Sequence, residues 1–246
     1  MTVRRVRDKR GWAWRVAVAI VKPLLFATTR PNWIDGHKIP EAGGCLLVPN
    51  HVSYADPLTI AHLVYDHGRL PHFLAKAELF QIKVLGFLLR AVGQVPVERF
   101  SRNAAGAYDA AVAGVRRGEC VVVYPEGTIT RDPDLWPMVG KSGAARIALA
   151  TGCPVIPIGQ WGVQELMGPN EKRPHVFPRK TVTMKVGDPV DLADLMTQPR
   201  TPTLVAEATA RIMGAVTVLV GELRGEQPPA EPFDPRKVIA AGEELP

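Results

Sequence analysis

The chain has 246 residues, 46% of them hydrophobic and 22% charged, so it can bury a sizeable core and is not a natively disordered protein. The net charge of +6 is unevenly placed, because residues 1–30 hold eight lysines and arginines against one aspartate, a net +7. The rest of the chain therefore sums to −1, which argues against a domain-wide basic surface for nucleic acid.

The first predicted element follows this basic cluster. Residues 12–27, WAWRVAVAIVKPLLFA, are apolar at 13 of 16 positions. A helix of that length would reach only about 24 Å, short of a hydrocarbon core of about 30 Å, and Arg15, Lys22 and Pro23 interrupt it. Basic residues, two tryptophans and a short apolar run predict an amphipathic helix in the cytoplasmic membrane interface. The alternatives are a helix packed on the domain, or a signal peptide, which the missing small-residue cleavage site disfavours.

Short apolar runs alternate with longer helical patterns along the rest of the chain. We predict strands at 44–50, 72–75, 94–97, 120–125, 154–159 and 181–187, and helices at 57–67, 77–91, 103–118, 142–152 and 203–224. Strands separated by helices predict an α/β fold, with a mostly parallel central sheet flanked by helices.

Composition divides the chain into three parts. Residues 1–30 are the expected membrane-interface segment, 31–224 the folded domain, and 225–246 a Pro-rich polar tail that we expect to be extended or disordered. A second apolar stretch, 79–92, is richer in large side chains than one buried helix face requires. We expect its surplus to lie beside the N-terminal segment and to complete a membrane-facing patch.

Several familiar sites lack support. The cysteines lie beside apolar runs without CxxC spacing, which predicts reduced core thiols in a cytosolic compartment: Cys45, Cys120 and Cys153. There is no HExxH pattern or other recognisable ligand set, so no metal site is indicated. GKSG at 140–143 lacks the first glycine of a phosphate loop, because Leu135 stands there, and no GxSxG elbow supports a serine hydrolase.

The strongest chemical signal is His51 followed five positions later by Asp56, where the strand at 44–50 meets the next helix. Ligands bind at such junctions in open α/β sheets. An aspartate that accepts the N–H of one imidazole nitrogen leaves the other nitrogen to accept a proton, as a general base requires. Ser53 and Asp56 are also expected to cap the helix at 57. The alternative is a structural histidine in a satisfied turn.

Further polar clusters follow other predicted strands. Lys76 closes the strand at 72–75, Arg99 follows the strand at 94–97, and Glu126 and Gly127 follow the strand at 120–125. Taken singly, each is explained as well by a plain turn or a solvated charge. If these strand ends share one edge of the sheet, a base lies beside an anion receptor.

Four segments, in order, resemble the sequence blocks of the glycerolipid acyltransferase family, whose bacterial members acylate lysophosphatidic acid. NHVSYADP is similar to the first block, NHxSxxDP, and GQVPVER to the second. YPEGT resembles the third, usually FPEGT, and CPVIPIG the fourth. AKAEL and KSGAARIA resemble the connecting segments, so the resemblance covers roughly residues 34–190.

The resemblance implies a 1-acylglycerol-3-phosphate acyltransferase bound peripherally to the cytoplasmic face of the membrane. Its co-substrate is acyl-CoA or acyl carrier protein, and no cofactor or metal is expected. The resemblance implies that His51 is the base and Asp56 its orienting partner. The resemblance assigns the glycerophosphate site to Lys76, Arg99, Glu126, Gly127, Thr128 and Arg131.

One departure from the family pattern affects the phosphate site. Members often have arginine directly after EGT, but Ile129 stands here. The phosphate contact is therefore expected from Arg131, or from Arg99 and Lys76. Oxyanion donors are expected among backbone N–H groups near the helix start at 57. Alternative acceptors are glycerol-3-phosphate, another lysophospholipid or a glycolipid, and a second class of function is a non-catalytic membrane-binding module.

Overall fold

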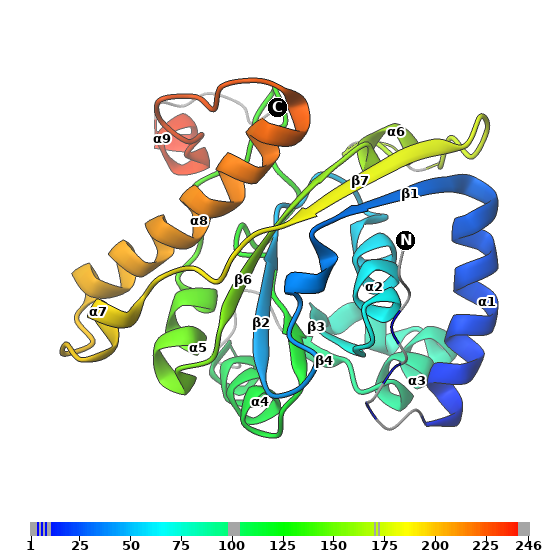
Figure 1. Cartoon of the computed structure of the whole chain (residues 1–246), viewed down its shortest axis with the longest axis horizontal. Coiled ribbons are helices and arrows are strands. Elements are labelled where there is room, and N and C mark those ends of the chain that lie inside the picture. Colours follow the sequence, from blue (N-terminus) through cyan, green and yellow to red (C-terminus); the bar gives the residue numbers. More distant parts are fainter. Residues whose placement is uncertain are drawn as a thin grey trace.

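A computed structural model describes residues 4, 6, 8, 11–97, 104–169, 171 and 173–240. At its centre is a sheet that has seven strands within these residues, in the order β1-β7-β6-β2-β5-β3-β4, and helices cover both faces (Figure 1). The predicted α/β architecture is confirmed.

The strands are β1 (Thr29–Ile34), β2 (Cys45–Pro49), β3 (Pro71–Lys76), β4 (Val95–Val97), β5 (Cys120–Val122), β6 (Val155–Trp161) and β7 (Lys180–Val186). The longer helices are α1 (Trp12–Thr28), α2 (Asp56–Asp66), α3 (Lys83–Ala91), α4 (Ala104–Arg116), α5 (Gly143–Thr151) and α8 (Pro202–Arg224). The short helices are η1 (Gly36–Lys38), η2 (Ala77–Gln81), α6 (Val163–Leu166), α7 (Ala193–Met196) and α9 (Pro235–Ala240).

Strand direction places the chemistry at one edge of the sheet. β6, β2, β5, β3 and β4 pair in parallel, so their carboxyl ends lie at the same edge. The antiparallel pairing of β6 with β7 reverses β7 and its parallel neighbour β1. The carboxyl ends of β2, β3, β4 and β5 therefore lie on one side of the sheet, as the predicted site requires.

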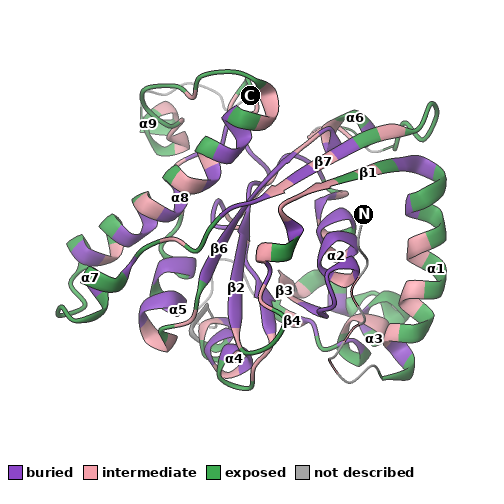
Figure 2. Cartoon of the chain, viewed as in Figure 1, coloured by how far each residue is buried: buried purple, intermediate pink, exposed green. Residues whose placement is uncertain are grey.

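The central strands are buried along their length (Figure 2), and their residues alternate between two hydrophobic cores. Leu46 and Val48 of β2 face the core that α4, α5 and α8 cover. Cys45 and Leu47 of the same strand face the core that α2 covers. Because both faces are buried, these strands appear in the sequence as continuous apolar runs rather than as alternating patterns.

Strand β1 was not predicted. Its sequence, TRPNWI, contains Pro31 and Asn32, which disfavour a strand by propensity. In the described part of the chain β1 lies at the edge of the sheet and has β7 as its one partner strand, and proline is tolerated at such an edge. Because β1 runs from Thr29 to Ile34, it crosses position 30, where the sequence analysis separates the membrane-interface segment from the folded domain.

The predicted helix at 77–91 is two elements, η2 and α3. The break is at Ile82, which has an extended backbone (φ −70°, ψ 113°). The chain folds back there, so that the Phe80 carbonyl packs against Gly86, where a Cβ would clash, and accepts a hydrogen bond from Arg90 at 3.0 Å. Absence of a side chain at Gly86 permits this close approach.

Two expectations about the chain ends need correction. Pro23 does not break the N-terminal helix, because α1 continues through it to Thr28. The described part of the C-terminal tail is not simply extended, because it forms α9 and its Phe233 carbonyl accepts the N–H of Val139 at 3.0 Å.

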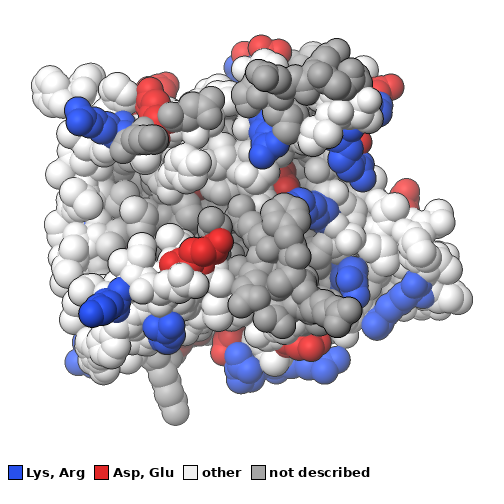
Figure 3. Space-filling view, turned by 180° about the vertical axis from the view of Figure 1, so that it is seen from behind, with Lys and Arg blue, Asp and Glu red and all other residues white. Residues whose placement is uncertain are grey.

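Helices α1 and α3 share an exposed apolar surface, here called the α1–α3 face. Side chains four positions apart along α1 are exposed: Trp12, Val16, Ile20 and Leu24. Ile82, Val84 and Phe87 beside and on α3 are exposed as well. The rings of Trp12 and Phe87 lie 5.9 Å apart, so the two helices adjoin, as expected. In Figure 3 the left edge, which α1 forms, consists mainly of uncharged atoms interrupted by lysine and arginine side chains.

Among the described residues, α8 is the helix that is long and apolar enough to cross a membrane by length and composition. It packs along β6, and Ala208, Ile212 and Val216 belong to the core on that side of the sheet. We therefore interpret α8 as a core helix.

Candidate active site

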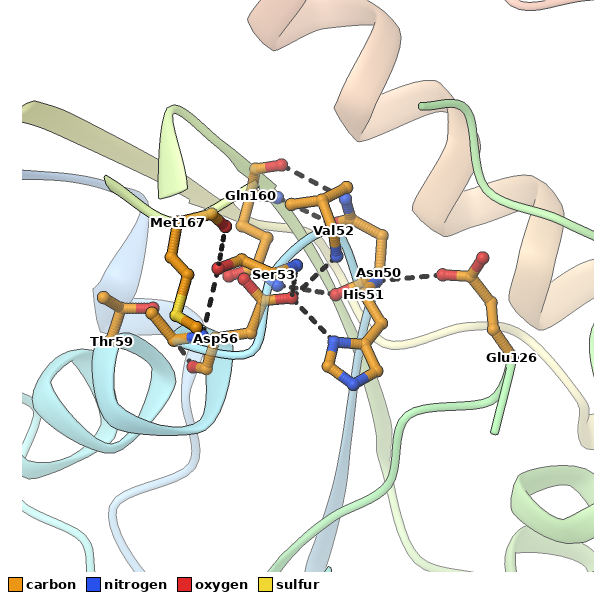
Figure 4. A network of polar contacts seen from close by, with 10 residues as sticks. Asn50, His51, Val52, Ser53, Asp56, Thr59, Glu126, Gln160 and Met167 are labelled. Atoms are coloured by element: carbon orange, nitrogen blue, oxygen red, sulfur yellow. Dashed lines mark hydrogen bonds and ion pairs between the residues drawn. The ribbon is translucent and has the colours of Figure 1, made fainter. Parts of the chain in front are cut away.

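His51 and Asp56 form a hydrogen-bonded pair at the carboxyl end of β2 (Figure 4). His51 Nδ1 lies 2.7 Å from Asp56 Oδ2. The same oxygen accepts the backbone N–H groups of Val52 at 2.7 Å and Ser53 at 2.9 Å. Because this carboxylate oxygen accepts hydrogen bonds, Nδ1 carries the proton and donates it. Nε2 is then the nitrogen of the ring that can accept a proton.

The environment of Asp56 has two opposing effects on the pKa of its carboxyl. Burial raises the pKa of the Asp56 carboxyl, and the hydrogen bonds from His51, Ser53 and Val52 lower it in part. The carboxyl is fully buried, whereas the His51 side chain keeps 13% of its surface exposed. The pair thus has a fixed, dry end and an imidazole that can reach a substrate.

Tyr124, two residues after the end of β5, packs against the imidazole. The two rings are stacked, 4.2 Å between centroids and 25° between planes. Burial, followed by the charge of Asp56, raises the pKa of the Tyr124 hydroxyl well above its usual range. Stacking restricts rotation of the His51 ring and adds to the constraint from Asp56.

A reciprocal pair of amides, which sequence reasoning missed, joins the ends of β2 and β6. Gln160 N donates to Asn50 Oδ1 at 2.8 Å, and Gln160 Nε2 donates to the Asn50 carbonyl at 2.6 Å. Asn50 Nδ2 donates in turn to the Gln160 carbonyl at 3.2 Å. Both residues are fully buried. In the sequence, Gln160 stands out as a polar residue directly after the apolar run at 154–159. Its partner could not be predicted, because the partner depends on the order of the strands in the sheet.

The predicted capping of α2 is wrong in detail. The N-cap is Ala55, whose side chain cannot cap, and Asp56 turns back toward His51 instead. Ser53 Oγ accepts the N–H of Ala55 at 3.0 Å and donates to the Met167 carbonyl at 2.6 Å. The turn is held by these contacts, so its rigidity comes from side chains that bridge to α6 as well as from local bonds.

The expected oxyanion donors at the start of α2 are already engaged. Pro57 has no N–H. Other backbone N–H groups there donate within the protein, namely those of Val52, Ser53, Ala55, Asp56, Leu58 and Thr59. These groups therefore do not support the expectation.

The Glu126 side chain contacts the backbone of the turn that carries His51. Glu126 Oε1 accepts the N–H of His51 at 2.9 Å, and Oε2 accepts the N–H of Met138 at 2.9 Å. The residue is 2% exposed, and burial raises its pKa to about 8. Thr130 N donates to the His51 carbonyl at 2.8 Å. The loop after β5 thus holds the backbone of His51 on both its N–H and its carbonyl side.

Gly127 makes the turn that follows Glu126, with φ +71°, and Lys141 lies over it. A Cβ at Gly127 would stand 2.9 Å from Lys141 Nζ, so the ammonium is beside this turn. Thr128 is half-buried, and Arg131 is exposed. The sequence analysis considered 140–143 as a phosphate loop and set it aside, so Lys141 was not among the predicted site residues.

The remaining predicted residues lie at the same edge of the sheet or outside the described chain. Lys76 is the last residue of β3 and pairs with Val97, the last residue of β4. Arg99 lies outside the described residues. In the described part of the chain, no three histidine, cysteine or acidic side chains gather in a way that could hold a metal ion.

Comparison with known sequences identifies the class to which this fold and site belong. The Acyltransferase family matches residues 31–161, more than half of the chain, and the chain belongs to this family.

Individual relatives are more specific. The chain is 35% identical over 124 residues to the chloroplastic 1-acyl-sn-glycerol-3-phosphate acyltransferase BAT2 of Brassica napus, covering 50% of this chain and 34% of that protein. It is 31% identical over 135 residues to the 1-acyl-sn-glycerol-3-phosphate acyltransferase of Borreliella burgdorferi, covering 51% and 52%. The match to the Bacillus subtilis protein of the same name is 27% over 175 residues, covering 70% and 79%. The chain therefore spans about a third to a half of the first two of these relatives.

A solved structure has the same fold. The crystal structure of the 1-acyl-sn-glycerophosphate (LPA) acyltransferase PlsC from Thermotoga maritima aligns with a TM-score of 0.62, covering 91% of this chain and 86% of that one. The sequence identity is 21%, so this likeness speaks for the fold alone.

Proposed function

We propose that this protein transfers a fatty acyl group from an acyl thioester, acyl-CoA or acyl carrier protein, to the free hydroxyl of 1-acylglycerol-3-phosphate, giving phosphatidic acid. The names of the sequence relatives support the substrate class. The observation that carries the proposal is the 2.7 Å contact between His51 Nδ1 and Asp56 Oδ2, which makes Nε2 a proton acceptor at the carboxyl edge of the sheet.

In this scheme His51 Nε2 takes the proton of the acceptor hydroxyl while the hydroxyl oxygen attacks the thioester carbonyl carbon. The C–S bond then breaks, and the leaving sulfur receives the proton from the imidazolium. The Asp56 carboxylate stabilises that imidazolium. The acceptor attacks directly, so no acyl-enzyme forms. Base catalysis of this kind contributes about 10²–10⁴-fold.

Cations at the same edge supply the acceptor phosphate site. Lys141 Nζ lies beside the Gly127 turn, and β3 ends at Lys76. Arg99 and Arg131, on segments that follow β4 and β5, are assigned to the same site. Charge-assisted contacts to phosphate are stronger than neutral hydrogen bonds. Glu126 holds the protein backbone around this site, because both its oxygens accept backbone N–H groups.

The substrates are amphiphiles, so we place the protein peripherally on the cytoplasmic face of the membrane, with the α1–α3 face against the lipid. Trp12 is 58% exposed, Ile20 62% and Val84 73%, which is unusual for large apolar side chains in a monomer. Arg15 and Lys83 are exposed on the same two helices. An amphipathic surface with basic residues gains both apolar burial and attraction to anionic lipid.

The decisive experiment is an acceptor and donor panel on the purified full chain. Free thiol release is followed with lysophosphatidic acid, glycerol-3-phosphate, a neutral lysophospholipid and a glycolipid, each with acyl-CoA and with acyl carrier protein. We expect lysophosphatidic acid to be preferred and the product to be phosphatidic acid by mass spectrometry. Preference for another acceptor would mean that the protein belongs to the same family but has a different acceptor substrate.

A non-catalytic membrane-binding module is the second candidate. It predicts vesicle binding without thiol release for any acceptor. The constraints on His51 from Asp56, Tyr124 and Glu126 favour catalysis, because a module that only binds lipid has no use for an oriented imidazole.

A further inference from the structure

The segment between α6 and β7 exposes a large aromatic side chain at its tip. Phe177 is 88% exposed, more than any other large hydrophobic side chain among the described residues, and its neighbour Val176 is 47% exposed. Exposing such a side chain to water is unfavourable by roughly 1.5–3 kcal/mol relative to burying it. A partner that covers Phe177 is therefore favoured.

The residues around this tip are basic. Among the described residues of 171–180, Arg173, Arg179 and Lys180 stand against the single acid Glu171. Arg173 and Arg179 are exposed. An apolar tip ringed by positive charge fits an anionic lipid surface, where the ring enters the headgroup region and the cations stay among phosphates.

One end of this segment is fixed beside the end of α1. The Arg179 guanidinium donates to the Thr29 carbonyl at 2.6 and 3.2 Å, directly after the end of α1. At the other end, the Met167 carbonyl accepts Ser53 Oγ, in the turn that carries His51. The segment therefore runs from the catalytic turn to the end of α1.

The tip extends the α1–α3 face at the opposite end from α3. α3 lies beside the start of α1, where Trp12 meets Phe87, and the α6–β7 segment lies beside its end (Figure 1). Seen from behind, this segment forms the projection at the upper left of the edge that α1 occupies (Figure 3). All three elements thus border one edge of the molecule.

We propose that the segment 173–179 is a second membrane contact, in which Phe177 enters an anionic lipid surface and the flanking cations bind its phosphates. This rests on the proposed membrane placement of the α1–α3 face. The α1–α3 face has α3 beside the start of α1, so it leaves the end of α1 free to tilt away from the bilayer. A further contact at that end limits the tilt and holds the turn that carries His51 at one orientation to the lipid that carries its acceptor.

The test measures partition of the purified full chain onto vesicles of phosphatidylcholine with phosphatidylglycerol, and of phosphatidylcholine alone. Variants are Phe177→Ser, Arg173→Gln and the matched control Ile239→Ser, which removes a 60% exposed apolar side chain from α9. Thermal unfolding of each variant verifies that the fold is intact.

We expect Phe177→Ser to lower the partition constant about tenfold on anionic vesicles. Arg173→Gln should lower it about fivefold on anionic vesicles and leave it unchanged on phosphatidylcholine alone. Ile239→Ser should bind like wild type. The proposal is overturned if Phe177→Ser binds as well as wild type, or if it loses no more binding than Ile239→Ser.

This measurement does not depend on turnover. If wild type binds vesicles through Phe177 but releases no thiol in the acceptor panel, the acyltransferase proposal fails and this one stands. If wild type is active and Phe177→Ser partitions normally, the reverse holds.

Discussion

Glu126 Oε1 accepts the backbone N–H of His51 at 2.9 Å, so a fully buried carboxyl from the loop after β5 holds the residue that follows β2. Its other oxygen holds Met138 N. A residue first assigned to substrate phosphate therefore has both oxygens bonded to the protein, and we expect its replacement to act on turnover through the position of the His51 imidazole.

Replacing the base and its partner tests the chemistry. His51→Ala should lower turnover by about 10²–10⁴-fold, because the acceptor hydroxyl loses its base. Asp56→Asn should also be severely damaging, since the amide no longer orients the imidazole or stabilises its charge. Thiol release under saturating substrates measures the effect, with circular dichroism to verify folding. Near wild-type turnover in a folded His51→Ala protein would contradict the proposed mechanism.

Replacing Glu126 separates positioning from phosphate binding. Glu126→Gln puts an amide NH₂ against one backbone N–H, which costs about 1–3 kcal/mol for an unsatisfied buried donor. We expect kcat to fall while the KM for the acceptor changes little, because substrate contacts remain. A rise in acceptor KM at unchanged kcat would instead place Glu126 on the phosphate.

Glu126 also makes stability depend on pH. Its folded pKa is about 8, above the ordinary value of 4.5, because burial disfavours the charged form. The native state then binds the proton more tightly than the unfolded state, so the contribution is fully present below about pH 4.5 and is lost as pH rises through about 8. The raised pKa of Asp56 acts with the same sign. Denaturant unfolding across this window should show stability falling with pH, and less steeply in Glu126→Gln.

Lys141 offers a test of the acceptor site. Lys141→Met keeps much of the side chain's volume and removes its charge, so acceptor efficiency should fall about 10- to 100-fold, which corresponds to 1.5–3 kcal/mol, with donor efficiency unchanged. Arg99→Ala should behave in the same way. The control Lys237→Met lies on α9, on an exposed surface. Equal losses for donor and acceptor would contradict a phosphate role for Lys141.

The α1–α3 face is best tested by substitution rather than by deleting residues 1–30. Lys22 Nζ bonds buried Asp66 at 2.7 Å, and Asp8 contacts the fully buried Arg69 at 3.3 Å, so deletion would expose charged groups of the core. The double variant Ile20→Ser with Leu24→Ser changes only exposed positions.

We expect that double variant to release the protein from anionic vesicles, measured by sedimentation. Raising salt should weaken wild-type binding only in part, because apolar burial is not screened. Complete release by salt would mean that charge alone holds the protein on the vesicles. Unchanged binding of the double variant would mean that α1 does not contact the lipid.

Local patterns were enough to predict much of the fold. The buried strands β2 and β6 and the helices α2, α4 and α5 follow from apolar runs and helical periodicity, which depend on neighbours along the chain. The His51–Asp56 contact is local in the same sense, because five positions within one tight turn allow few arrangements.

The supports of that pair depended on the tertiary structure. Glu126 meets His51 across 75 positions, and Asn50 meets Gln160 across 110. Edge strand β1 exists because β7 offers it a partner, although its own residues disfavour a strand. A buried polar group must find a hydrogen-bond partner wherever the fold places one. The sequence by itself pointed to His51 and Asp56 as the proposed catalytic pair, and only the strand order decided which buried groups hold the pair in place, because it brings distant backbone N–H and carbonyl groups together.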